Sequence, residues 1–141
     1  MTEQTYQLLV ADDDADFRRA VCEIFAPFFR LIEADSGEEA LELAAREEVH
    51  LALFDMHMKR LTGLETIAHL RQLKKGLPCI LMSAALDDQI MAEAQLLETF
   101  SVLMKPVSRQ VLRSTIELAL FRTYGWPQLK FSDASKHCGD T

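Results

Sequence analysis

The chain has 141 residues and a mass of 16.0 kDa, which suffices for one compact domain with a core of its own. Hydrophobic residues make up 49% and charged residues 26%, an ordinary globular composition that argues against disorder. The formal net charge of −7 excludes the basic surface that binding to nucleic acid or to anionic lipid requires.

Short apolar runs bounded by polar residues alternate with segments of helical period. In chain order, strands are predicted at 8–11, 30–34, 51–55, 79–83 and 102–105. Helices are predicted between them, at 14–29, from 36 onward, and at 64–74, 87–97 and 108–122. Such apolar strands are typical of a parallel sheet buried on both faces. Their alternation with helices predicts an α/β fold, a (βα)5 doubly wound five-stranded parallel sheet.

Individual residues indicate where these helices begin and end. Pro27 favours a kink or an early end in the first helix. Ser36 is the expected N-cap of the second helix, with Glu39 completing a capping box, and Ser108 is the candidate cap of the fifth. Lys74-Lys75-Gly76 is the predicted stop of the third helix.

The predicted domain spans 1–122, and 123–141 is a C-terminal tail too short for a second domain. The tail is either disordered or docked on the fifth helix through Trp126 and Phe131, and both alternatives stay open. Residues 1–7 contain no Lys or Arg and so form no signal peptide. No apolar run approaches the roughly 20 residues that cross a bilayer, so no membrane contact is expected.

Three cysteines stand far apart and form no CxxC motif: Cys22, Cys79 and Cys138. Cys22 and Cys79 lie in apolar stretches, so we expect both to be small core residues. This cysteine usage predicts a reduced, cytoplasmic setting.

Polar side chains follow the apolar runs at the point where each run stops. Asp12 and Asp13 follow the first strand, Asp55 ends the third, Ser83 ends the fourth and Lys105 ends the fifth. The ligand crevice of an open α/β sheet lies beyond the carboxyl ends of its strands. We therefore expect carboxylates, a hydroxyl and an ammonium group to meet at one edge. Taken singly, each of these residues has a plainer interpretation as a loop, cap or surface residue.

Carboxylates that converge on one spot repel one another unless a cation lies between them. Oxygen ligands with room for water suit Mg²⁺, which makes Asp12, Asp13 and Asp55 the candidate metal ligands. Asp55 is also a competent nucleophile toward phosphorus and would form an acyl phosphate. Lys105 and Ser83 can then contact the phosphoryl oxygens. The unit 105–106 places the lysine before a proline, which in cis would aim it inward.

The chain resembles the response-regulator receiver domains of bacterial two-component signalling over roughly 6–122. The resemblance rests on pieces in a specific order and spacing: 8–14, 33–41, Asp55 with Gly63 and Leu64 after it, 81–84 and 104–106. It implies a flavodoxin-like sheet with strand order 2-1-3-4-5. It also implies a stand-alone phosphorylation switch that catalyses only its own phosphorylation and dephosphorylation, and so is not an enzyme in the usual sense.

The resemblance assigns a role to each residue of the site. Asp55 becomes the phospho-acceptor, Asp13 a direct Mg²⁺ ligand and Asp12 a ligand acting largely through water. The backbone carbonyl of His57 completes the protein ligands.

Two further residues complete the implied site, with Ser83 as the switch hydroxyl and Lys105 as the phosphoryl contact. The implied partners are a histidine kinase or phosphotransfer protein and a downstream protein. A homodimer through the fourth helix, fifth strand and fifth helix is a further possibility. With no DNA-binding domain attached, direct DNA binding is not expected.

The chain departs from the family pattern in three places. Lys59 replaces the usual proline four residues after the acceptor. Val102 replaces the aromatic residue three positions before the lysine, and Phe100 is the candidate substitute. Glu98-Thr99 replaces the usual Gly-Ala before the fifth strand, so the fourth helix is expected to end differently.

Two rival interpretations come from other classes of protein. A haloacid-dehalogenase-like phosphatase would use the motif Asp12-x-Asp14 after a strand, but Asp16 stands where that motif wants Thr or Val, and no cap domain is predicted. A receiver-like scaffold that is never phosphorylated is suggested by Lys59 and Val102.

Overall fold

The computed structural model describes residues 5–125. Five strands alternate with five helices along this part of the chain. The strands are β1 (Gln7–Ala11), β2 (Arg30–Ala34), β3 (Leu51–Asp55), β4 (Cys79–Ser83) and β5 (Ser101–Met104). The helices are α1 (Ala15–Phe25), α2 (Gly37–Arg46), α3 (Gly63–Leu73), α4 (Asp88–Leu96) and α5 (Arg109–Tyr124).

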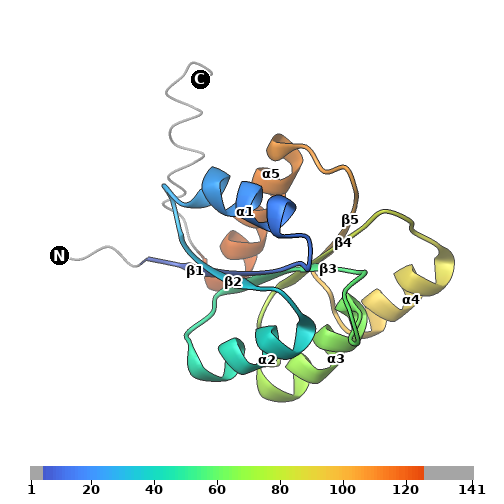
Figure 1. Ribbon diagram of the computed structural model, residues 1–141. Helices are drawn as coiled ribbons and strands as arrows, with labels where there is room; N and C mark the ends of the chain where they lie inside the picture. Colours follow the sequence, from blue (N-terminus) through green and yellow to red (C-terminus); the bar gives the residue numbers. More distant parts are fainter. Residues whose placement is uncertain (1–4, 126–141) are drawn as a thin grey trace.

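The five strands form one parallel sheet in the order β2-β1-β3-β4-β5, which confirms the predicted doubly wound fold. Helices α1 and α5 cover one face of this sheet, and α2, α3 and α4 cover the other (Figure 1). Two separate hydrophobic clusters fill the spaces between sheet and helices, one on each face. β3 and β4 are buried along their whole length because they are inner strands of a sheet covered on both faces.

Two of the three cysteines belong to these clusters, as predicted. Cys22 lies on α1 and Cys79 on β4, and both are buried free thiols. Burial raises the pKa of each thiol to about 11, so both remain protonated and unreactive at neutral pH. Cys138 lies outside the described residues.

The helix ends show how well local signals predict structure. Ser36 caps α2 and accepts a hydrogen bond from the Glu39 N–H, but the Glu39 carboxylate accepts from the Asp35 N–H, so the predicted capping box is only half formed. A complete capping box occurs instead at the start of α3, between Thr62 and Glu65. Ser108 caps α5 as predicted.

Helix α5 continues two residues beyond its predicted end at Arg122. Gly125, in the left-handed conformation with φ 64°, caps it. The Tyr124 hydroxyl donates to the His50 carbonyl at 2.7 Å, and the rings of Tyr6, His50 and Tyr124 pack together. The end of α5 is thereby fastened to the edge of the sheet where β1 and β3 begin. Both alternatives for the tail, disorder or docking through Trp126 and Phe131, concern residues outside the described range.

Arg71 joins the ends of α3 and α4 to the loop before β4. Its guanidinium donates to the carbonyls of Leu97 at 2.8 Å, Leu77 at 2.7 Å and Glu98 at 3.1 Å. Glu98, with φ 58°, occupies the left-handed region, which is uncommon for a residue with a side chain. Helix α4 therefore ends in a strained turn that an arginine from a neighbouring helix supports.

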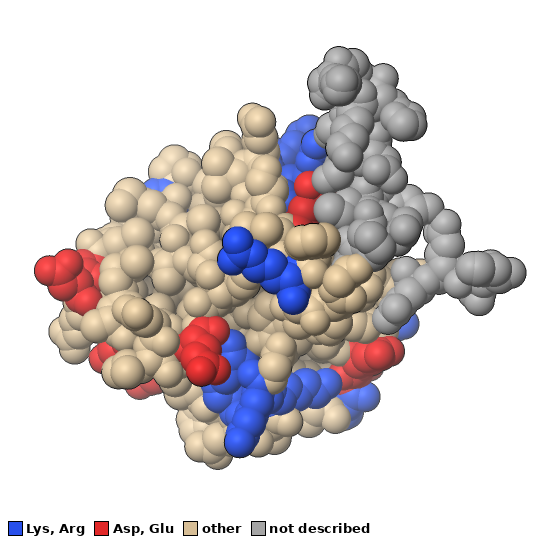
Figure 2. Space-filling view, turned by 180° about the vertical axis from the view of Figure 1, so that it is seen from behind, with Lys and Arg blue, Asp and Glu red and all other residues tan. Residues whose placement is uncertain are grey.

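The surface around β5 is markedly apolar. Exposed apolar side chains on α4, β5 and α5 are Met91, Leu96, Met104, Val111, Leu118 and Phe121. Seen from behind, toward the β5 edge of the sheet, a wide area carries few charged side chains (Figure 2). Between residues 5 and 125, no helix has both the length and the apolar character needed to span a bilayer.

Candidate functional site

The structure brings together the three aspartates that the sequence places at strand ends. Asp12 and Asp13 follow β1, and Asp55 is the last residue of the neighbouring strand β3. One carboxylate oxygen from each residue lies within 4.8 Å of the other two. Asp12 and Asp55 are buried and Asp13 is exposed, so the cluster opens to solvent on the Asp13 side.

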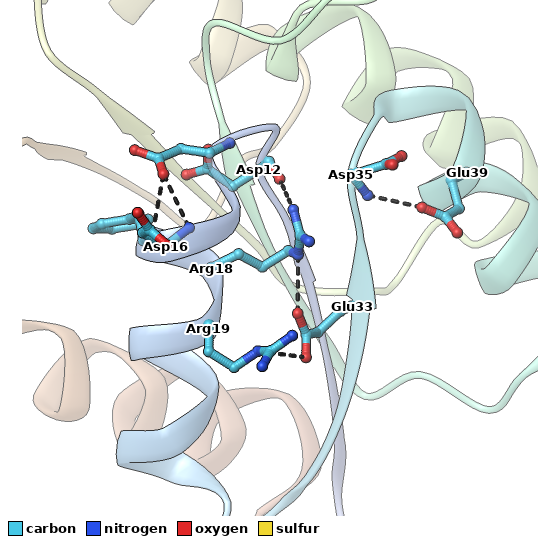
Figure 3. Close-up of polar contacts among 9 residues, drawn as sticks. Asp12, Asp16, Arg18, Arg19, Glu33, Asp35 and Glu39 are labelled. Carbon is cyan, nitrogen blue, oxygen red and sulfur yellow. Dashed lines mark hydrogen bonds and ion pairs between the residues drawn. The ribbon is translucent and has the colours of Figure 1, made fainter.

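Asp12 is held in place by contacts from α1 (Figure 3). Its carboxylate accepts a hydrogen bond from the Asp14 N–H at 2.9 Å. Arg18 donates to the Asp12 backbone carbonyl at 2.6 Å and to Glu33 on β2 at 2.9 Å. Arg19 also pairs with Glu33, at 3.9 Å. The segment between β1 and α1 is therefore fixed from both α1 and β2.

Asp55 is positioned by a close approach of α3. A side chain at Gly63 would bring its Cβ to 2.6 Å from the Asp55 carbonyl oxygen and to 2.6 Å from Leu81, so only glycine fits there. The Gly63 N–H also donates to the Met56 carbonyl at 2.9 Å. The start of α3 thus closes the loop after the candidate acceptor and rests directly on its backbone.

Lys105 reaches into the acidic cluster from the end of β5. Its ammonium contacts the Asp55 carboxylate at 2.8 Å and the Asp12 carboxylate at 3.2 Å. The peptide bond between Lys105 and Pro106 is cis. Burial alone would lower the pKa of Lys105, but the hydrogen bond to Asp55 and the charges of both carboxylates raise it above its ordinary value. The lysine is therefore fully charged at neutral pH.

The surroundings of Asp12 disfavour its ionised form. Burial raises its pKa above the ordinary value, and the nearby charge of Asp55 raises it further. The Asp14 N–H and Lys105 act in the opposite direction without cancelling this effect. An ionised Asp12 is thus destabilised relative to water, which is the condition that a bound cation relieves.

The donor atoms of the cluster fit a hard divalent cation. All three side-chain donors are carboxylate oxygens, and the exposed side of Asp13 leaves room for water in the coordination shell. No nitrogen or sulfur donor belongs to this group, so it is unlike a zinc site. Lys105 already places one positive charge against two of these three carboxylates, those of Asp12 and Asp55.

Ser83 lies at the same edge of the sheet and is fully buried. Its hydroxyl donates to the Ala85 carbonyl at 2.7 Å and accepts from the Ala85 N–H at 3.3 Å. The Lys105 N–H donates to the Ser83 carbonyl at 2.8 Å, which joins the ends of β4 and β5. A hydrogen bond from the hydroxyl to a ligand of the acidic cluster would therefore require exchange of its partner Ala85.

Of the three departures from the family pattern, Lys59 follows the site strand β3, whereas Val102 and Glu98-Thr99 lie at or before the start of β5, at the opposite edge of the sheet. Lys59 is exposed in the loop after β3. Val102 packs against the cluster under α2, α3 and α4, whereas Phe100 packs against the cluster under α1 and α5. Phe100 therefore does not occupy the place of Val102 in this conformation. His57 is exposed, and its backbone carbonyl remains a predicted ligand.

Asp14 does not join the metal-binding group. Its carboxylate accepts hydrogen bonds from the N–H groups of Asp16 and Phe17, so it is the N-cap of α1. Asp14 therefore acts as a helix cap and not as a ligand of the cluster. The second aspartate of a haloacid-dehalogenase motif is thus engaged in capping.

Two residues that touch the site were not singled out in the sequence, and both lie in the first turn of α1. Arg18 fixes the Asp12 backbone, and the ring of Phe17 lies 4.2 Å from the Lys105 ammonium. Helical period marks Phe17 as an inward position but does not show which residue it meets. An arginine after an acidic cluster carries no signal of its own.

Comparison with known proteins gives one consistent family. Residues 8–117 match the model of the response regulator receiver domain. The transcriptional regulatory protein GlrR of Escherichia coli (strain K12) is 29% identical over 123 residues, which cover 85% of this chain and 27% of GlrR. A response regulator receiver protein of Anaeromyxobacter sp. (strain Fw109-5) is 31% identical over 101 residues, covering 71% of this chain and 42% of that protein.

The chain thus spans less than half the length of these relatives. The prediction of no direct DNA binding does not fit relatives that are named transcriptional regulatory proteins.

Solved structures show the same fold. A CheY-like receiver domain protein from Methanospirillum hungatei JF-1 aligns with a TM-score of 0.84 at 21% identity, covering 86% of this chain and 98% of that chain. The chemotaxis protein CheY4 of Vibrio cholerae aligns with a TM-score of 0.79 at 22% identity, covering 83% of this chain and all of that chain.

Proposed function

The chain belongs to the response regulator receiver domain family, and from that premise we propose that it accepts a phosphoryl group on Asp55 and thereby switches a protein-interaction surface. The donor would be a histidine kinase or a phosphotransfer protein, in the cytoplasm. The observation that carries the proposal is the meeting of three carboxylates with the Lys105 ammonium, 2.8 Å from Asp55. As a receiver, the chain is a signalling domain rather than a classical enzyme.

The transfer needs positioning and charge compensation, and little else from the protein. A carboxylate oxygen of Asp55 forms a bond to phosphorus as the bond from phosphorus to the donor nitrogen breaks, and the donor imidazole leaves. Water later attacks the acyl phosphate, which releases inorganic phosphate and restores the carboxylate. Asp55 is held for this chemistry by Gly63 beneath it and by Lys105 beside it.

The residues present fit Mg²⁺. When bound by Asp12, Asp13, Asp55 and the backbone carbonyl of His57, this ion would neutralise charge on the phosphoryl oxygens. Lys105 would follow Asp55 to a second phosphoryl oxygen, since its ammonium is already at hydrogen-bond distance from the acceptor. The Ser83 hydroxyl would break its hydrogen bond to the Ala85 carbonyl and donate to a third phosphoryl oxygen.

That exchange at Ser83 suggests how phosphorylation reaches the surface. Ser83 and Lys105 end adjacent strands and are joined through the backbone. A phosphoryl group adds about −1.5 to −2 charges, to which the Lys105 ammonium and the Ser83 hydroxyl can donate hydrogen bonds. The contacts would favour one of two arrangements of the β4–α4 loop and β5, which border the apolar surface of α4, β5 and α5. We propose a downstream protein, or a second copy of the chain, as its occupant.

Labelling with acetyl phosphate in the presence of Mg²⁺ tests the proposal. Intact-mass spectrometry should show the addition of one phosphoryl group to the wild-type chain and none to Asp55→Asn. Asp88→Asn is a matched control, because this exposed aspartate opens α4 outside the acidic cluster. Stoichiometric labelling of Asp55→Asn would refute the acceptor. A wild-type chain that takes up no phosphoryl group would instead favour the unphosphorylated scaffold.

A further inference from the structure

Lys105 makes a third contact that the phosphorylation chemistry does not use. Its ammonium lies 4.2 Å from the centroid of the Phe17 ring, within the range of a cation–π interaction. The lysine side chain is only 21% exposed, so this attraction is less screened by water than at an open surface. The ammonium therefore has one aromatic and two carboxylate partners.

Both carboxylate partners become engaged elsewhere when the reaction proceeds. Asp12 and Asp55 are candidate ligands of a divalent cation, and the Asp55 carboxylate is also the proposed phospho-acceptor. A cation in the cluster would repel the ammonium and compete with it for the same two carboxylates. The Phe17 ring, by contrast, is a partner of the Lys105 ammonium that neither a cation nor a phosphoryl group would bind.

Phe17 is itself held firmly. It lies in the first turn of α1, and its N–H donates to the Asp14 cap at 3.2 Å. Its half-buried side chain packs against the hydrophobic cluster under α1 and α5. The ring therefore stays in place when the partners of Lys105 change.

We propose that Phe17 is a positioning residue that keeps the Lys105 ammonium over the acidic edge while the lysine passes from carboxylate to phosphoryl partners. Without the ring, an ammonium repelled by the cation would turn toward solvent and lose its alignment with the phosphoryl oxygen. This inference rests on the proposed function of Asp55. It differs from a packing role, which would act on the fold and not through the lysine.

A double-mutant cycle separates these two roles. Phe17→Leu keeps an apolar side chain but removes the ring face, and Phe17→Tyr keeps the face. With acetyl phosphate and Mg²⁺, Phe17→Leu should slow labelling about two- to fivefold, whereas Phe17→Tyr should retain the wild-type rate. In a Lys105→Met background, Phe17→Leu should have no further effect. The same loss in both backgrounds, or no loss in either, overturns the proposal.

Phe28→Leu is the matched control, since Phe28 lies past the other end of α1, roughly 15 Å along the helix, and is 46% exposed. It should leave the labelling rate unchanged. A slowing equal to that of Phe17→Leu would mean that any loss of an aromatic ring in this part of the chain perturbs the site, and would overturn the proposal.

A second measurement needs no phosphorylation. Protons above an aromatic face resonate upfield, so the ε-methylene protons of Lys105 should be shifted upfield in the wild type and not in Phe17→Leu. Loss of the signal in Lys105→Met assigns it. The shift should persist when Mg²⁺ and beryllofluoride are added, and its collapse would overturn the proposal. If the wild type accepts no phosphoryl group, the proposed function fails and this measurement decides the role of Phe17 alone.

Discussion

The ionised carboxylate of Asp12 lowers the free energy of unfolding, and the size of this effect depends on pH. Because its pKa is raised above 3.8, the folded chain binds this proton more tightly than the unfolded chain does. The free energy of unfolding therefore falls as the pH rises through the raised pKa, and it remains lowered at neutral pH. The pairing of Lys105 acts at the other end of the scale: it stabilises the fold up to alkaline pH and is lost only as pH rises through its own raised pKa.

We accordingly expect Asp12→Asn to increase the free energy of unfolding at neutral pH in metal-free buffer. Urea denaturation followed by circular dichroism measures it. The advantage of the variant should shrink as the pH is lowered toward 3.8, since the wild-type Asp12 then becomes neutral too. A variant that is less stable than the wild type at neutral pH, or a gap that does not change with pH, would contradict this account.

Gly63 offers a sharper test of packing at the site. Gly63→Ala would place a methyl group 2.6 Å from the Asp55 carbonyl, so the backbone must shift, at a cost of about 1–3 kcal/mol. Labelling of Asp55 should slow as well. Gly76→Ala is the matched control because no atom lies within 4 Å of its added Cβ, and its effect should stay within about 0.5 kcal/mol of the wild type. Equal losses in both variants would show that the close approach is not limiting.

The sequence predicted which aspartates meet but not what surrounds them. Asp12, Asp13 and Asp55 end neighbouring apolar runs, and parallel strands bring such ends to one edge. The partners of the cluster depend on how α1 is rotated and tilted over the sheet. Periodicity leaves that rotation open, so the contacts of Phe17 and Arg18 became visible only in the structure.

Among the elements, Arg71 on α3 links this helix to the end of α4 and to the loop before β4. Arg71→Met would leave the carbonyls of Leu77, Leu97 and Glu98 without their charged donor. We expect a loss of about 2–3 kcal/mol in the free energy of unfolding, because hydrogen bonds from a charged group to poorly solvated carbonyls are costly to break. Lys75→Met, an exposed residue just past the same helix, should change stability by less than about 0.5 kcal/mol.

Amide hydrogen exchange would locate the effect of Arg71→Met. Faster exchange should appear in the last turn of α4 and in the turn after it, where Glu98 holds its left-handed conformation, and in the loop before β4. Uniformly faster exchange across the whole sheet would show instead that Arg71 supports the fold at large rather than these two ends.

Strands were predicted more accurately than helix ends. β2, β3 and β4 have the predicted bounds, and the ends of β3 and β4 coincide with the polar residues Asp55 and Ser83. Helix α1 ends at Phe25, earlier than the predicted 29, in keeping with Pro27 two residues beyond it. Helix α5 runs to Tyr124, where Gly125 caps it, and a hydroxyl bond to His50, far away in the sequence, also holds its last turn. Such a tertiary contact leaves no local signal.

For the whole molecule, the apolar surface of α4, β5 and α5 leads to a prediction about association. If a second copy occupies it after phosphorylation, beryllofluoride with Mg²⁺ should raise the sedimentation coefficient of the wild type. Val111→Glu places a charge on this surface at a position that is 48% exposed, and should abolish the shift while leaving labelling intact. Leu73→Glu, 54% exposed on α3, is the matched control and should still associate. An unchanged wild-type coefficient would leave a different downstream protein as the occupant.

The contact between Tyr124 and His50 lies at the sheet edge opposite the acidic cluster. It limits how far the C-terminus can be truncated. A truncation after Arg122 would preserve every group of the acceptor site yet remove the tyrosine that closes over Tyr6 and His50. The shortened product would lose this contact at the start of β1 and β3 and would expose the rings of Tyr6 and His50, which Tyr124 otherwise covers. A stop codon after Gly125 retains both the contact and the left-handed cap, and so gives the better boundary for recombinant work.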